Sequence, residues 1–92
     1  MNLSKKWDLG IDPDVLKSLR KTPRFDAERI LQIIRSLPYD PYFGDVKKMK
    51  GEENVWRRRI GNYRIFYKLK NLEMVILVFR LERRTSSTYA KR

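Results

Sequence analysis

The sequence contains no cysteine and no histidine among its 92 residues. Without cysteine it can form neither a disulfide nor a reactive thiolate, which is compatible with a reducing compartment. Without histidine it lacks the side chain that most often acts as a general base and binds zinc. No apolar run is long enough to span a bilayer, and the start, MNLSKKWDL, lacks a signal-peptide core. We therefore expect a cytoplasmic protein with no metal, no cofactor and no membrane attachment.

Negative charge is also scarce, since 11 acidic residues stand against 22 basic ones. The net charge of +11 is typical of a small domain that binds nucleic acid, an acidic protein or an anionic membrane. The hydrophobic content of 41% is enough for a modest core. At this length we expect one domain that spans residues 1–92.

The first part of the chain predicts a strand followed by a helix. Alternating apolar side chains over residues 3–9 indicate a strand that ends at Gly10. Asp12 followed by Pro13 is a typical helix start, because the carboxylate can cap the first turn and proline suits the first helical position. This helix is expected to run to about Lys21.

A second helix is predicted over residues 24–37, where apolar side chains recur every three or four positions. Pro38 ends it, and we expect the two helices to form an antiparallel hairpin packed on a sheet. Residues 38–54 are rich in turn-forming residues and predict an irregular connection. Its lysines fit a solvated loop and a direct phosphate contact equally well: Lys47, Lys48 and Lys50.

The stretch 55–67, VWRRRIGNYRIFY, predicts a two-stranded hairpin with its turn at Gly61-Asn62. Residues 74–79, MVILVF, form a continuous apolar run that predicts a central strand covered on both faces. A charged tail, 80–92, follows. The whole order predicts an α+β domain, β-α-α-β-β-β, with a helical hairpin packed on a small, mainly antiparallel sheet.

The hairpin carries an unusual load of arginine. Side chains alternate along a strand, so Arg57 and Arg59 share a face that could also include Arg64. Three guanidiniums on one patch repel each other, and phosphate is the anion that best fits their fork. Arg57 and Arg59 are also compatible with simple edge charges that prevent aggregation. The other basic hairpin residues are predicted to be solvated: Arg58, Lys68 and Lys70.

In this order the segments resemble the RelE/ParE superfamily of toxins from toxin–antitoxin pairs, over nearly the whole chain. The resemblance rests on DPDVL at 12–16, GDVKKMKG at 44–51 and above all WRRRIGNYRIFY at 56–67, followed by an apolar strand, arginines and Tyr89. It implies a RelE-like fold and metal-independent cleavage of mRNA in the ribosomal A site. It also implies an acidic, RelB-like antitoxin that wraps around a monomeric toxin and binds operator DNA on its behalf.

The family's functional positions carry over to two groups of residues. The resemblance implies a catalytic set: Arg57, Arg59, Arg64, Arg83 and Tyr89. Arg83 is the simplest match to the arginine after the last strand, with Arg80 and Arg84 as alternatives. The residues expected to contact RNA or the ribosome are Lys47, Lys48, Lys50, Arg84, Lys91 and Arg92.

One departure from the family affects proton transfer. Some members carry lysine where this chain has Arg57 and Arg59, and arginine practically cannot lose its proton. The resemblance therefore leaves Tyr89 as the candidate acid or base. Besides the nuclease, two functions stay open: a ParE-like toxin that poisons DNA gyrase without catalysis, and a weak homologue that only binds the ribosome or RNA.

Overall fold

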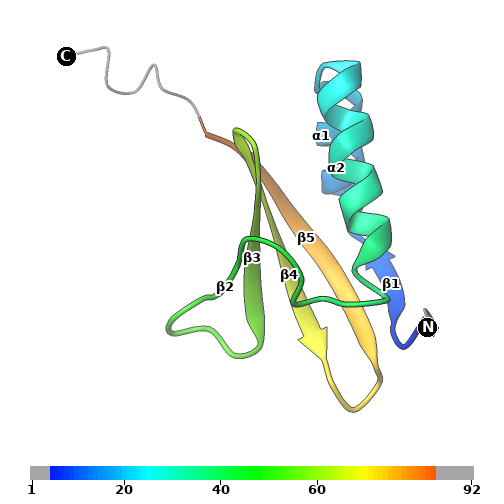
Figure 1. The fold of residues 1–92 in the computed structure, drawn as a ribbon, viewed down its shortest axis with the longest axis vertical. Helices are drawn as coiled ribbons and strands as arrows, with labels where there is room; N and C mark the ends of the chain where they lie inside the picture. Colours follow the sequence, from blue (N-terminus) through cyan, green and yellow to red (C-terminus); the bar gives the residue numbers. More distant parts are fainter. Residues whose placement is uncertain (1–4, 85–92) are drawn as a thin grey trace.

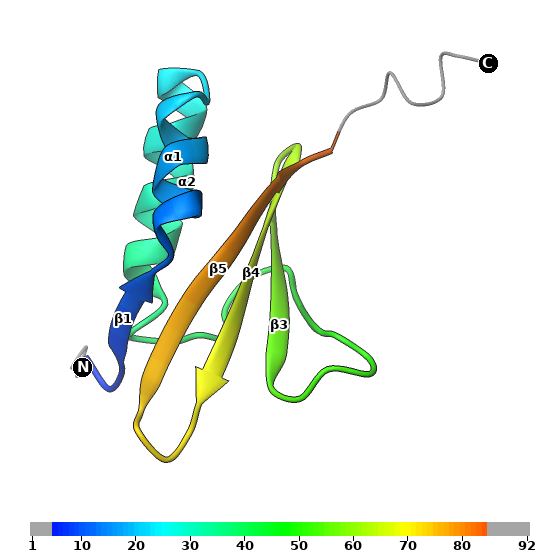
Figure 2. The ribbon, with the colours of Figure 1, turned by 180° about the vertical axis from the view of Figure 1, so that it is seen from behind.

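A computed structural model describes residues 5–84, and its ribbon is drawn in Figure 1. The sheet contains five strands in the order β1-β5-β4-β3-β2, and only β1 and β5 pair in parallel. Both helices lie against one face of this sheet (Figures 1 and 2). The predicted α+β class and helical hairpin are therefore confirmed. The elements are β1 (Asp8–Ile11), α1 (Pro13–Arg20), α2 (Arg24–Ser36), β2 (Val46–Lys48), β3 (Val55–Ile60), β4 (Tyr63–Lys70) and β5 (Val75–Arg83).

The core lies between the helices and the sheet. Asp12 caps α1 as predicted, because its Oδ1 accepts a hydrogen bond of 2.9 Å from the Asp14 amide. Each helix turns its apolar stripe inward, and burying one such side chain contributes about 1.5–3 kcal/mol. Ten of the buried core side chains come from α1, α2, β4 and β5: Val15, Leu19, Ile30, Ile34, Tyr63, Ile65, Tyr67, Leu69, Ile76 and Val78.

The first strand differs from its prediction. It runs from Asp8 to Ile11 and contains Gly10, which was expected to end it. The parallel partner decides these bounds, since Leu9 lies opposite Ile76 and the Asp12 amide donates to Val78 O at 2.9 Å. β1 and β5 lie far apart in the sequence, so their pairing cannot be inferred from the alternation of apolar and polar residues within one strand. Residues 1–4 lie outside the described residues.

The connection over residues 38–54 was predicted to be irregular, but part of it is a strand. It contains β2, a three-residue strand that pairs antiparallel with β3, with Val46 opposite Arg58 and Lys48 opposite Trp56. Three residues are too few to show an alternating pattern. Lysines on an edge strand oppose further pairing with other chains.

The hairpin of β3 and β4 forms as predicted, with Ile60 opposite Tyr63 across the turn. Gly61 has φ +58°, the backbone conformation that a two-residue hairpin turn requires at its first central position. β5 continues to Arg83, beyond the predicted end at residue 79, because β4 offers it partners as far as Tyr63.

The expectation that the last strand is covered on both faces is wrong. The helices cover Ile76 and Val78, which are fully buried, but Val75 and Leu77 are only half-buried on the other face. We call the sheet face opposite to the helices the open face (Figure 2). This one-sided packing leaves a surface on which strand residues can meet a ligand.

Candidate functional site

The open face carries basic side chains from three neighbouring strands. Arg59 lies directly opposite Arg64 on β4, and Arg57 lies opposite Phe66. Phe66 lies opposite Arg80 on β5. Directly opposed residues of antiparallel strands project from the same face. Arg57, Arg59 and Arg64 therefore share a face, as their alternation predicted, and Arg80 joins them.

Arg83 lies on the other face from this group, and its predicted catalytic role stays a prediction. It lies opposite Tyr63, whose ring faces the helices, and its guanidinium carbon is 5.9 Å from the centre of that ring. Arg80 instead lies 5.3 Å from the centre of the Phe66 ring on the open face. A register shift beside Phe66 changes the alternation along β5. Sequence spacing could not reveal that shift.

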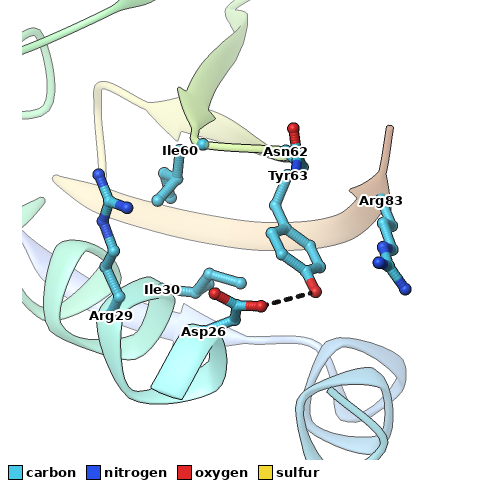
Figure 3. A pocket seen from close by; sticks show the side chains of 8 residues that line it. Asp26, Arg29, Ile30, Ile60, Asn62, Tyr63 and Arg83 are labelled. Atoms are coloured by element: carbon cyan, nitrogen blue, oxygen red, sulfur yellow. Dashed lines mark hydrogen bonds between the residues drawn. The ribbon is translucent and has the colours of Figure 1, made fainter. Parts of the chain in front are cut away.

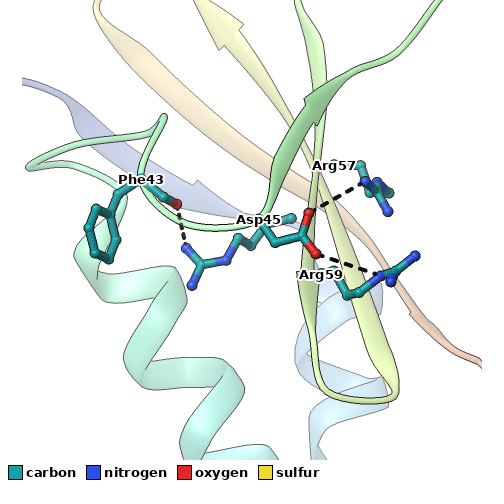
Figure 4. Close-up of polar contacts among 5 residues, drawn as sticks. Phe43, Asp45, Arg57 and Arg59 are labelled. Carbon is teal, nitrogen blue, oxygen red and sulfur yellow. Dashed lines mark hydrogen bonds and ion pairs between the residues drawn. The ribbon is translucent and has the colours of Figure 1, made fainter.

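A carboxylate lies between two of the arginines (Figure 4). Asp45 Oδ1 is 3.9 Å from Arg57 Nη2, and Oδ2 is 3.9 Å from Arg59 Nε. The Arg57 side chain is only 12% exposed, against 44% for Arg59 and 57% for Asp45. Sequence reasoning missed Asp45, because an acidic residue in a turn-rich loop looks like an ordinary turn former.

Arg64 has a donor that nothing within residues 5–84 satisfies. Its Nε is buried and has no hydrogen-bond partner there. A buried donor without a partner costs about 1–3 kcal/mol. Arg58 Nε, on the helix side of β3, is likewise buried without a partner in the described chain, so this feature is not peculiar to the open face.

Arg58 was predicted to be solvated, and this is wrong. It is half-buried on the helix side of β3, and its Nη1 donates to Phe43 O at 2.6 Å. The Tyr67 hydroxyl donates to Pro41 O in the same loop, and burial raises the pKa of Tyr67 above its ordinary value. These two bonds hold residues 41–45, the segment that ends in Asp45, against the sheet.

The remaining predicted contact residues are dispersed. Lys47 lies opposite Arg57 and shares the open face, whereas Lys48 lies opposite Trp56 and points to the other side. Lys50 is exposed in a turn, and Arg84 is exposed just after β5. Exposure of Lys68 and Lys70 is confirmed. Three predicted residues lie outside the described part of the chain: Tyr89, Lys91 and Arg92.

A second polar site lies where α2 meets the β3–β4 turn (Figure 3). The Tyr63 hydroxyl donates to Asp26 Oδ2 at 3.2 Å beside a cavity of about 150 Å³ that Arg29 and Arg83 also line. Burial, and then the Asp26 carboxylate, raise the pKa of Tyr63. The bond ties the tip of the hairpin to α2, so we assign this site to the fold.

Two kinds of feature are absent from residues 5–84. No group of three or more His, Cys, Asp or Glu side chains there is arranged to hold a metal ion. No helix in the same region is both long and apolar enough to cross a membrane.

The chain is similar to known toxins along most of its length. The family model for the ParE toxin of the type II toxin-antitoxin system, parDE, matches residues 10–87. A curated relative from Methanocaldococcus jannaschii, named as a RelE1 toxin, is 29% identical over 82 residues, which cover 86% of this chain and 91% of the relative.

Solved structures give the same result for the fold. The archaeal RelE–RelB complex from Pyrococcus horikoshii OT3 matches with a TM-score of 0.77 and 28% identity, covering 88% of this chain and 98% of that chain. The isolated E. coli RelE toxin matches with a TM-score of 0.75 over 92% of this chain and 93% of that chain. Because the identity is only 19%, the similarity to the E. coli toxin supports the fold alone.

Proposed function

Because the chain belongs to the ParE toxin family of type II toxin–antitoxin systems and is a RelE-type toxin, we propose that it is a ribosome-dependent mRNA endonuclease. It would act in the cytoplasm, cut messages in the ribosomal A site and thereby inhibit translation. The observation that supports this proposal best is the cationic open face, with Arg57, Arg59 and Arg64 side by side.

These arginines suit the cleavage of RNA without a metal. The 2′-hydroxyl of the message attacks the adjacent phosphorus, the bond to the 5′-oxygen breaks, and negative charge builds up on the phosphoryl oxygens. Guanidiniums stabilise such charge through charge-assisted hydrogen bonds. A well-placed donor of this kind contributes about 3–4 kcal/mol to the transition state. Arg64 lies opposite Arg59 on the open face, and we propose that its guanidinium donates to a phosphoryl oxygen.

We assign the fourth cation of the site to Arg80 rather than Arg83, since Arg80 shares the open face, where it pairs with Glu82 at 2.5 Å. Lys47 lies opposite Arg57, and we propose that it contacts the RNA backbone. Proton transfer is assigned to Tyr89, which lies outside the described residues, from the family position alone. If Tyr89→Phe cleaved ribosome-bound message at the wild-type rate, that assignment would be wrong.

We also propose a partner antitoxin, acidic in character, that wraps around the toxin and covers the basic face. The similar proteins from Pyrococcus horikoshii and Methanococcus jannaschii were solved as complexes of RelE with RelB. The charge of +11 on this chain complements an acidic partner. In this proposal operator DNA is bound only through the antitoxin, and the toxin alone is a monomer.

Primer extension on a defined message, with and without programmed ribosomes, tests the nuclease. Wild type should cut only when ribosomes are present. Arg64→Ala should lower the cleavage rate about 100- to 1,000-fold, as the loss of one transition-state donor does. Arg35→Ala removes the same charge from the exposed side of α2 and should leave the rate unchanged. Equal rates for all three proteins would remove Arg64 from the site.

Inhibition of DNA gyrase is the second candidate, because the matching family model is that of a ParE toxin. Absence of cuts with and without ribosomes would favour it, and a supercoiling assay would then decide. A gyrase inhibitor needs no group of phosphate-binding arginines on one face, which is why we place it second.

A further inference from the structure

We propose that Asp45 is an internal counter-ion that occupies the position of a phosphate between Arg57 and Arg59, and that an incoming phosphate must displace its carboxylate. This inference rests on the proposed function, whose substrate carries that phosphate. In this proposal the Asp45 carboxylate competes with the phosphate for Arg57 and Arg59 on the open face.

The geometry of the carboxylate supports this assignment. Its two oxygens each approach a different arginine (Figure 4), at 3.9 Å from Arg57 Nη2 and 3.9 Å from Arg59 Nε. A phosphate group also presents two oxygens to two guanidiniums. Charge-assisted hydrogen bonds measure about 2.7–2.9 Å, so the observed pairs are loose ion contacts. A phosphate at hydrogen-bond distance would outcompete them.

The movable partner of each pair is the acid. Asp45 is 57% exposed, so its side chain can rotate into water, whereas Arg57 is only 12% exposed and is held against the sheet. Displacement therefore changes the side-chain torsion of one aspartate and leaves the cations where the ligand needs them.

The backbone of Asp45 stays in place during such a change. Its carbonyl accepts from the Arg59 amide at 3.0 Å, which continues the pairing of β2 with β3. Upstream, Arg58 and Tyr67 bind the carbonyls of Phe43 and Pro41. The carboxylate is thus tethered beside the arginines and rebinds them when the ligand leaves, at a high effective concentration.

This arrangement favours ligands with several contacts over simple anions. Without a ligand, Asp45 offsets the repulsion between two adjacent guanidiniums, one of them nearly buried. Any anion that binds between the two arginines must overcome the same free-energy cost of displacing Asp45. An RNA chain recovers that cost through Arg64 on the neighbouring strand, whereas inorganic phosphate cannot. Arg80 already pairs with Glu82 at 2.5 Å on β5.

Binding of inorganic phosphate to the whole protein tests the proposal, followed by NMR of the arginine Nε signals. Asp45→Asn should bind phosphate roughly three- to tenfold more tightly than wild type, the gain expected from removing two partly exposed ion pairs. Glu53→Gln removes the same charge from an exposed turn and should change the affinity less than about twofold. Equal effects of the two variants, or weaker binding by Asp45→Asn, would overturn the proposal.

A measurement on the wild-type protein does not depend on the folding of a variant. During the phosphate titration the carboxyl carbon signal of Asp45 should shift together with the Nε signals of Arg57 and Arg59. Shifts of the arginine signals with no change at Asp45 would overturn the proposal. Neither experiment uses ribosomes or cleavage, so a failed primer-extension assay and a failed displacement of Asp45 remain distinct results.

Discussion

At the scale of single residues, polar side chains set the conformation of the loop beside the site. The Tyr67 hydroxyl is buried at the sheet and donates to Pro41 O, and Arg58 donates to Phe43 O. Carbonyls of a loop packed on a sheet need such partners, because water cannot reach all of them. Two side chains that point toward the helix side of the sheet thereby fix the segment that presents Asp45 to the open face.

Removing one of these bonds should destabilise the fold. Tyr67→Phe leaves Pro41 O without its partner and should lower the free energy of unfolding by about 1–3 kcal/mol. Tyr39→Phe is the matched control, because the Tyr39 side chain is exposed. Urea denaturation of both variants and wild type measures the difference. Equal stability of the two variants would mean that the bond contributes nothing.

The raised pKa of Tyr67 also predicts a dependence of stability on pH. Burial makes the folded state hold the phenolic proton more tightly than the unfolded chain does. The contribution to stability is therefore complete below the ordinary tyrosine pKa of about 10 and is lost as the pH rises above it. Each unit in that range should cost up to about 1.4 kcal/mol per such group.

Urea denaturation between about pH 9 and pH 11 measures this loss. Tyr67→Phe should show a shallower decline than wild type, and Tyr39→Phe should decline as wild type does. Part of the decline should persist in Tyr67→Phe, because the pKa of Tyr63 is raised in the same direction. An unchanged slope in Tyr67→Phe would contradict the assignment.

At the scale of elements, the segment 41–45 is held against β3. Gly44 has φ +91°, and a Cβ there would overlap the Arg58 guanidinium. The backbone conformation therefore favours glycine, and an added Cβ would also push aside the flexible end of the Arg58 side chain. β2 follows directly and places Asp45 and Lys47 beside Arg57 and Arg59.

Two glycine substitutions separate these requirements. Gly51 also has a positive φ, +78°, but nothing lies within 4 Å of its Cβ position. Both Gly44→Ala and Gly51→Ala should suffer the backbone strain. Gly44→Ala should lose about 1–3 kcal/mol more, because the methyl group displaces Arg58 from Phe43 O. Thermal and urea unfolding measure this difference. Equal losses would show that Arg58 can move away without lowering the free energy of unfolding.

At the scale of the whole molecule, charge and one-sided packing act together. The helices cover one face of the sheet (Figures 1 and 2), and Lys47, Arg57, Arg59, Arg64 and Arg80 lie on the other face. A net charge of +11 attracts any polyanion, and it also makes binding sensitive to salt. In the proposed function, the arginines of the open face are the ones that contact the RNA backbone.

The salt dependence of RNA binding can therefore distinguish Arg80 from Arg83. Arg80→Gln and Arg83→Gln remove the same charge from opposite faces of β5. With a single-stranded 2′-deoxy oligonucleotide, which cannot be cut, Arg80→Gln should reduce the slope of log affinity against log salt by about 0.7. Arg83→Gln should leave the slope unchanged. A larger effect of Arg83→Gln would move the binding surface to the helix side.

The sequence by itself determined the features that depend on near neighbours in the chain. Asp12 and Pro13 start α1, Gly61 turns the hairpin, and simple alternation places Arg57, Arg59 and Arg64 on one face. Capping, turn geometry and the two-residue period act over a few positions, so they can be inferred without knowing the fold.

Only the tertiary structure decided the features that depend on distant partners. Pairing with β5 set the bounds of β1, and pairing with β3 made a strand of Val46–Lys48. The register shift beside Phe66 put Arg80, and not Arg83, on the open face. Asp45 meets Arg57 and Arg59 only because the loop folds back along β3. These choices are set by the free energy of packing segments that lie far apart in the chain, which local periodicity does not contain.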